Sequence, residues 1–236
     1  MMTDDPVRYE LNDGVAVLML DDGKANALSP ALIAAIHTAL DRAEREAAAV
    51  LLAGRPGRFS AGFDLRVMTG DADGLRSLVK GGAELLLRMY LHPRPLVAAC
   101  TGHALAAGAL LLLAADLRIG ARGQFRIGLN EVAIQLALPV FGVELARDRL
   151  ATRHFTAAVS QARIFDPEGA CAAGFLDELA APEELLDAGI AQARRLAALP
   201  HPAFRDTKLR ERRATVERIR ATLDDDIATL TRPVPG

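Results

Sequence analysis

Short apolar runs alternate with helical patterns through the first 120 residues, and this alternation constrains the fold more than any other feature. The runs at residues 48–53, 96–100 and 117–119 have the length of buried strands. Between them, residues 30–45 and 75–91 carry apolar side chains at helical spacing. Short apolar strands that alternate with helices are typical of a parallel sheet with helical crossovers. The sequence therefore predicts an α/β fold.

The two ends of the chain follow other patterns. Residues 7–11 and 15–20 are separated by Asn12-Asp13-Gly14 and predict an N-terminal hairpin, because the glycine of this turn can adopt positive φ. Beyond residue 139 nearly every predicted element is a helix. We therefore divide the chain into a core, residues 1–180, and a helical C-terminal region, residues 181–236.

Composition and charge exclude several classes of function. With 236 residues and 51% hydrophobic content, the chain can bury a substantial core. A net charge of −2 gives no indication of a nucleic-acid partner. The longest uncharged run, residues 101–115, is shorter than the roughly 20 residues that span a bilayer, and the acidic start lacks the apolar segment of a secretory signal. Cys100 and Cys171 are expected to be buried thiols. We expect a cytoplasmic protein.

Two glycine-containing turns each lie between an apolar strand and an apolar helical segment. The first is Phe59-Ser60-Ala61-Gly62-Phe63-Asp64-Leu65, and the second is Thr101-Gly102-His103-Ala104-Leu105-Ala106-Ala107-Gly108. Backbone N–H groups at the start of a helix have no partner within the helix, and the helix dipole adds partial positive charge there. Two such turns directed at one point would form an oxyanion hole, which stabilises negative charge on a carbonyl oxygen.

Five segments in this order resemble the crotonase superfamily, also called the enoyl-CoA hydratase/isomerase family, whose first oxyanion motif has the form Phe-x-Ala-Gly-x-Asp-Leu/Ile. An ordered series of this kind is far more specific than any one of its motifs. The resemblance implies a crotonase-like β/α spiral of repeated ββα units, and a C-terminal helical region that mediates oligomerisation into a homotrimer or a dimer of trimers. The segments are Lys24-Ala25-Asn26-Ala27-Leu28, the two turns, residues 114–119 and residues 128–132.

The resemblance also implies the catalytic groups. The backbone N–H groups of Phe63, directly after Gly62, and of Ala107, directly before Gly108, would be the oxyanion donors. Glu131 resembles the second catalytic carboxylate of the family. Its neighbours are apolar, and a carboxylate in a dry pocket has a raised pKa, as a general base at neutral pH requires. The alternative is an ordinary glutamate on an exposed turn.

The largest departure from the family is Leu110. Hydratases of the family carry their first catalytic glutamate two positions after the last glycine of the second turn, and here that position is Leu110. Two carboxylates assist the addition of water to a double bond, whereas a shift of the double bond needs only one base. We therefore predict an isomerase, with enoyl-CoA hydratase and a non-catalytic acyl-CoA-binding protein as alternatives. Five side chains elsewhere are candidates for the missing acid: Asp64, Glu84, Tyr90, His92 and His103.

Coenzyme A is expected only as part of the thioester substrate, and neither a permanent cofactor nor a metal is predicted. The loop at residues 24–28 resembles the one whose backbone meets the adenine end of coenzyme A. Lys208, in a basic C-terminal helix, could contact its phosphates, although a solvated helix face is the default interpretation of such charges. A serine peptidase of the same fold is strongly disfavoured, since residues 101–116 contain no serine near the start of the second helix. The other residues implied in binding are Lys24, Ala25, Ala27, Ala61, Asp64, Leu65 and Gly108.

Overall fold

The larger of two sheets has six strands, and its four inner strands are buried on both faces. In the computed structural model, which describes residues 5–230, the order of this sheet is β1-β2-β3-β5-β7-β9. The first two strands form the predicted antiparallel hairpin and the others run parallel. The α/β prediction is therefore confirmed. The bounds are β1 (Val7–Asn12), β2 (Val15–Leu20), β3 (Ala49–Gly54), β5 (Leu96–Cys100), β7 (Leu117–Ala121) and β9 (Glu178–Ala180).

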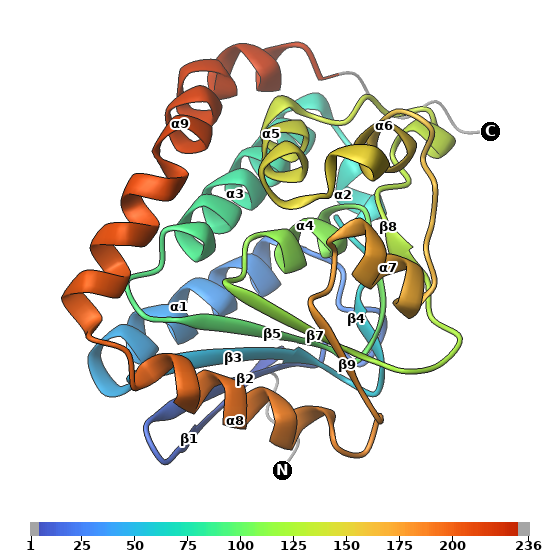
Figure 1. The fold of residues 1–236 in the computed structure, drawn as a ribbon. Coiled ribbons are helices and arrows are strands. Elements are labelled where there is room, and N and C mark those ends of the chain that lie inside the picture. Colours follow the sequence, from blue (N-terminus) through green and yellow to red (C-terminus); the bar gives the residue numbers. More distant parts are fainter. Residues whose placement is uncertain (1–4, 231–236) are drawn as a thin grey trace.

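A second sheet of three parallel strands was not predicted. It consists of β4 (Gly57–Ser60), β6 (Gly102–Leu105) and β8 (Ile127–Gly128), in the order β4-β6-β8. Each of these strands follows a strand of the larger sheet along the chain, which gives the repeated ββα unit that the resemblance implied (Figure 1). These strands are too short and too mixed in polarity to show a periodic pattern, so sequence analysis took them for turns.

The helices begin and end where local signals place them. Ser29 caps the first helix by accepting a hydrogen bond from Leu32 N. Asp166 caps α7 by the same kind of bond to Gly169 N, and Gly174 ends it with φ +96°. The helices are α1 (Pro30–Glu46), α2 (Leu65–Met68), α3 (Ala72–Tyr90), α4 (Ala107–Leu113), the 3-10 turn η1 (Val132–Ile134), α5 (Val140–Arg149), α6 (Thr152–Val159), α7 (Pro167–Ala173), α8 (Leu185–Ala197) and α9 (His201–Ala228).

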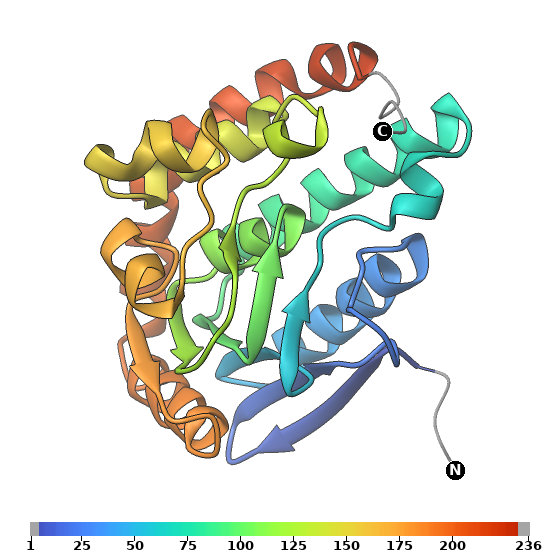
Figure 2. The same ribbon diagram turned by 90° about the vertical axis from the view of Figure 1, so that its right-hand side faces the viewer.

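Helices cover both faces of the six-stranded sheet (Figures 1 and 2). On one face, α1, α3 and α4 pack over strand residues such as Leu18 and Leu52. On the other face, α8 packs over residues such as Val17 and Leu51. Because successive side chains of a strand point to opposite faces, the continuous apolar runs of the sequence serve both cores.

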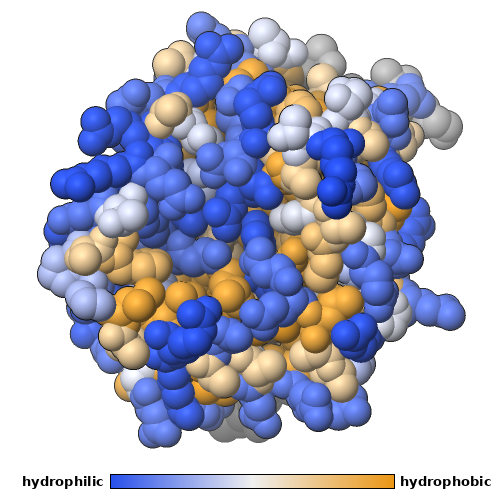
Figure 3. All heavy atoms as spheres, in the orientation of Figure 1, coloured by the Kyte–Doolittle hydropathy of each residue, from blue (hydrophilic) through white to orange (hydrophobic). Residues whose placement is uncertain are grey.

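The packing of α8 changes one argument for subunit contacts. The sequence predicts that its apolar face, Leu185, Leu186, Ile190 and Leu196, needs a second subunit to cover it. In the structure Leu185, Ile190 and Leu196 pack against the sheet of their own chain, whereas Leu186 is 36% exposed. The outer side of α9 is largely hydrophilic, while apolar surface gathers in the middle of the same face of the molecule (Figure 3). A trimer or a dimer of trimers stays a prediction that a mass measurement by light scattering would test.

Candidate active site

The two glycine turns are in contact, because they follow neighbouring strands. β4 and β6 pair in parallel, with Ser60 opposite Ala104, so both turns emerge at the same edge of the small sheet. A Cβ atom at Gly62, where φ is +92°, would lie 2.8 Å from the Ala106 Cβ and 3.3 Å from the Ala107 nitrogen. A Cβ atom at Gly108 would lie only 2.3 Å from the Ser60 oxygen. Glycine is therefore required at both positions for the turns to approach this closely.

The two predicted oxyanion donors are unpaired within residues 5–230. On either side of Phe63, Leu28 N donates to Gly62 O at 2.8 Å and Asp64 N donates to Leu28 O at 3.1 Å, but the Phe63 N–H has no acceptor. Ala107 is the first residue of α4, and its N–H is likewise without an acceptor. Free amides on two touching turns are the arrangement that an oxyanion requires.

Backbone strain accompanies this arrangement. Ala106, which precedes α4, has φ +50° and ψ −129°, an unfavourable conformation for a residue with a side chain. Its own N–H donates to Gly128 O at 3.0 Å, which ties the second turn to β8. Such strain costs about 1–3 kcal/mol per residue and clusters at functional sites. The second turn is therefore held in place by its neighbours rather than by its own preference.

A largely apolar cavity of about 170 Å³ opens beside the two turns. Its polar side chains in the described part of the chain are Asn130 and Glu131, and Glu131 is the only titratable one. Phe63 and Leu110, which the sequence singled out, also line it. The lining residues are Ala61, Phe63, Leu65, Met68, Leu75, Val79, Ala106, Leu110, Asn130, Glu131, Ile134, Leu136, Ala137, Pro139, Phe141 and Leu230.

Glu131 is a buried carboxylate in this cavity and not an exposed turn residue. Its carbonyl oxygen accepts hydrogen bonds from Ile134 N and Leu136 N, both at 3.0 Å, which fixes the residue at the start of η1. The side chain is 8% exposed and its Oε2 has no hydrogen-bond partner in the described structure. Burial raises the pKa of Glu131 to about 7. Such a group can both accept and return a proton near neutral pH.

Asn130 is a site residue that sequence analysis missed. It directly precedes Glu131, lines the same cavity, and its Oδ1 is buried without a hydrogen-bond partner among the described residues. A buried amide oxygen without a partner is costly, so it marks a place where a bound ligand or water can donate a hydrogen bond. Its position beside the proposed base was the one available signal.

The Leu110 side chain makes the cavity lining apolar at the position where hydratases of the family carry a glutamate. The side chain is 1% exposed and lines the cavity from α4. Of the five candidates for a second acid, none lines the cavity. Asp64 instead caps α2 through Arg66 N at 3.0 Å and forms an ion pair with the Arg66 guanidinium at 2.9 Å. Asp64 therefore acts as the N-cap of α2.

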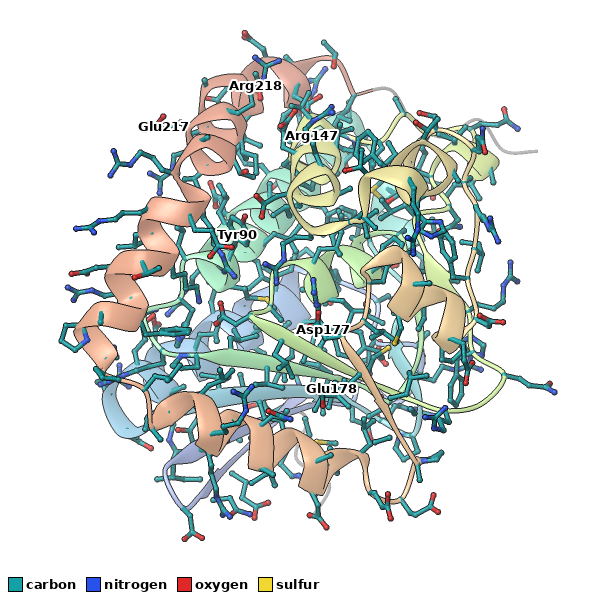
Figure 4. All side chains as sticks on the ribbon, viewed as in Figure 1. Tyr90, Arg147, Asp177, Glu178, Glu217 and Arg218 are labelled. Carbon is teal, nitrogen blue, oxygen red and sulfur yellow. The ribbon has the colours of Figure 1, made fainter. Side chains whose placement is uncertain are left out.

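Three other candidates for the second acid, Glu84, Tyr90 and His92, also lie outside the cavity. Glu84 lies on the exposed side of α3. The Tyr90 hydroxyl donates to Asp148, near the junction of α3 with α9 (Figure 4). His92 is buried beside Arg94. These side chains leave Glu131 without a partner acid.

The loop at residues 24–28 meets the first turn, as expected for a shared groove. Ala61 N donates to Ala25 O at 3.0 Å. Asn26, which sequence analysis did not assign to the site, shapes this loop. It is fully buried with φ +51°, and its side-chain amide donates to three backbone carbonyls. Lys24 is exposed at the edge of the loop, and Ala27 is half-buried.

A second hollow, of about 230 Å³, shares Ala61 with the cavity and is basic. It is lined by Ala25, Ala61, Leu105 and three side chains that sequence analysis did not assign to binding: Arg58, His103 and Arg126. His103 Nδ1 accepts a hydrogen bond from Arg126 N at 3.0 Å, so this candidate acid is a hydrogen-bonded residue of the second turn. Burial, Arg58 and Arg126 lower the pKa of His103. Neither arginine forms an ion pair within residues 5–230, so the hollow favours an anion.

Lys208 does not lie at this site. Its ammonium forms an ion pair with Asp116 Oδ2 at 2.8 Å and donates to His92 O at 2.9 Å, and the residue is 4% exposed. Arg212 shares the same carboxylate at 2.9 Å. Burial lowers the pKa of Lys208 to about 8. Lys208 therefore fastens α9 to the core, and the predicted phosphate contact finds no support in this subunit. Other charged residues of α9, such as Arg218, lie on its outer side (Figure 4).

Residues 5–230 contain neither a membrane-spanning helix nor a cluster of metal-binding side chains. No helix among them is long and apolar enough to cross a membrane. No group of three or more His, Cys, Asp or Glu side chains among them is arranged to hold a metal ion.

Comparisons with known proteins agree with this fold. The sequence model of the enoyl-CoA hydratase/isomerase family matches residues 10–233. The solved structure of an enoyl-CoA hydratase/isomerase family protein from Pseudomonas syringae is 47% identical, with a TM-score of 0.94, and the match covers 97% of this chain and 99% of that one.

Two sequence relatives carry different reaction names. Human mitochondrial enoyl-CoA delta isomerase 1 is 29% identical over 226 residues, which cover 94% of this chain and 75% of the human protein. A probable enoyl-CoA hydratase of Mycobacterium avium is 35% identical over 207 residues, which cover 83% of this chain and 77% of that protein.

Proposed function

The chain belongs to the enoyl-CoA hydratase/isomerase family, and on this premise we propose that it is an enoyl-CoA isomerase, which moves a double bond of an acyl-CoA thioester. One observation carries the choice of reaction. Glu131 is the only titratable side chain that lines the cavity within the described residues, and Leu110 occupies the place of the second carboxylate. A double-bond shift needs one group that removes a proton and returns it to another carbon.

The proposed reaction converts a 3-enoyl-CoA into a 2-enoyl-CoA. The thioester oxygen accepts hydrogen bonds from the Phe63 and Ala107 amides. The Glu131 carboxylate removes a proton from carbon 2, and the electron pair of that bond moves through the thioester to its oxygen, giving a dienolate. Protonated Glu131 then delivers the proton to carbon 4, and the double bond comes to lie between carbons 2 and 3. An oxyanion donor of this kind contributes about 3–4 kcal/mol of transition-state stabilisation.

The basic hollow supports a coenzyme A thioester as the substrate. Ala61 lines both the apolar cavity and the hollow, so a ligand that passes Ala61 can place an acyl group on one side and phosphates on the other. Arg58 and Arg126 supply the positive charge for these phosphates. The arm between the two ends would run along Ala25 and Ala61, in keeping with the role that the resemblance implied for both residues.

Hydration of a 2-enoyl-CoA is the second candidate, because a relative with 35% identity is named a probable hydratase. In this reaction Glu131 alone would have to activate the water and supply the proton. A purely binding protein is disfavoured for a different reason: a buried carboxylate without a partner lowers stability, and a binder would gain nothing from it.

Incubation with 3-enoyl-CoA and 2-enoyl-CoA in heavy water tests the proposal. We expect 3-enoyl-CoA to become 2-enoyl-CoA, with no mass increase that corresponds to added water. Hydration of 2-enoyl-CoA with a kcat of about 10 s⁻¹ or more, typical of enzymes, together with no isomerisation, would refute it.

A further inference from the structure

The segment directly after α9 forms part of the cavity wall, a role that the sequence did not indicate. Leu230, two residues beyond the last residue of α9, lines the cavity together with Leu75 and Val79 of α3 and with Pro139 and Phe141 at the start of α5. These residues belong to the apolar part of the lining, which a thioester held at the two turns would fill with its acyl chain.

Two polar contacts hold the end of α9 against the helices that line the cavity. Asp226 Oδ2 accepts a hydrogen bond from Val140 N at 2.7 Å. The residue before α5 is Pro139, whose side chain cannot cap the helix. Asp226, which lies in α9 and is far from α5 in the sequence, therefore acts as the cap of α5. Lys80 of α3 forms an ion pair with Asp224 at 2.8 Å. We call these two contacts the α9 clasp.

The ribbon views agree with this arrangement. The C-terminal end of α9 lies beside α5 and over the end of α3 in both orientations (Figures 1 and 2). Ile227, one turn before Leu230, is 7% exposed and packs into the main core. The position of Leu230 therefore depends on α9 being docked, and the clasp contributes to that docking.

We propose that Leu230, positioned by the α9 clasp, limits the length of acyl chain that the cavity accepts. The proposal rests on the proposed acyl-CoA substrate. Leu75, Val79 and Phe141 are at most 2% exposed and belong to the main core, so their positions are fixed by packing. Leu230 is half-buried at the end of a helix. Leu230 can therefore be changed without loss of the core.

Leu230→Ala and Leu230→Phe test the wall, with Leu209→Ala as the matched control. Leu209 lies on the same helix, is 40% exposed and does not line the cavity. The measurement is kcat/KM for 3-enoyl-CoAs of increasing chain length. We expect Leu230→Ala to raise the ratio of long-chain to short-chain kcat/KM by about tenfold or more, because each methylene in an apolar pocket changes selectivity by about tenfold or more. Leu230→Phe should lower that ratio, and profiles identical to wild type would overturn the proposal.

Asp226→Ala tests the clasp, with Asp225→Ala as its control. Asp225 is exposed and makes no side-chain hydrogen bond in the part of the chain that the structure describes. Asp226→Ala should shift the profile toward longer chains, and an unchanged profile would overturn the role of the clasp.

A second measurement separates this proposal from the proposed reaction. If the wild-type protein turns over no enoyl-CoA of any length, the proposed function fails. Calorimetric binding of saturated acyl-CoAs then reports the same chain-length limit in the same variants. An identical limit in wild type, Leu230→Ala and Leu230→Phe would overturn the wall.

Discussion

Replacing Glu131 with glutamine should abolish turnover and at the same time stabilise the protein. Glutamine keeps the shape of the side chain but cannot accept a proton. General base catalysis contributes typically 10² to 10⁴ in rate, and no other titratable group among the described residues lines the cavity to replace it. We therefore expect a loss of at least about a hundredfold in kcat, with acyl-CoA binding retained. Glu84→Gln, on the exposed side of α3, is the matched control and should leave both properties unchanged.

The expected gain in stability follows from the pKa of Glu131. Burial raises this pKa from 4.5 to about 7, so folding disfavours the charged form. Below pH 4.5 the group is protonated in both states and the penalty vanishes. It grows as pH rises and is complete above about pH 7, where the shift corresponds to about 3 kcal/mol. Because glutamine removes the charge, the free energy of unfolding should rise by up to this amount at alkaline pH and far less in acid.

Urea denaturation at mildly acidic and mildly alkaline pH measures this difference in the free energy of unfolding. The same pKa also makes a kinetic prediction: kcat/KM should rise with pH around a midpoint near 7, as Glu131 loses its proton. A loss of activity below about tenfold would show that the base lies elsewhere. A stability change that does not depend on pH would show that the carboxylate is not desolvated.

Three further predictions test other parts of the site. Leu110→Glu should raise hydration of 2-enoyl-CoA relative to Leu110→Gln, and equal rates in the two variants would remove the argument from the missing carboxylate. Gly108→Ala should lower the free energy of unfolding by about 1–3 kcal/mol and abolish activity, because its Cβ would lie 2.3 Å from the Ser60 backbone oxygen. Gly81→Ala is the control: its Cβ has open space around it, so chemical denaturation should show a neutral or stabilising effect. The double substitution of Arg58 and Arg126 by alanine should raise KM for acyl-CoA but not for a short thioester without phosphates. Steady-state kinetics measure both values, and equal effects on the two substrates would contradict a phosphate site.

Local patterns predicted the elements that depend on local energetics. The helix of residues 30–46 was visible because its capping serine, its first-turn proline and its apolar periodicity all act within a few residues. The hairpin at residues 7–20 and the buried strands were visible for the same reason. The short strands of the second sheet had no such signal, since two to four residues cannot show a period and their pairing partners lie over 20 residues away.

The features of the site also fall into two groups: those that the local sequence indicates and those that only the folded chain shows. The sequence alone identified the two glycine turns, Glu131 as the proposed base and the apolar residue Leu110 in place of a carboxylate, because motif order and residue type suffice for these. Only the tertiary structure showed that Lys208 forms an ion pair with Asp116. It also showed that Leu230 lines the same cavity as Glu131, which lies 99 residues earlier in the chain. Burial, desolvation and the meeting of distant segments are properties of the packed chain, and no local pattern encodes them.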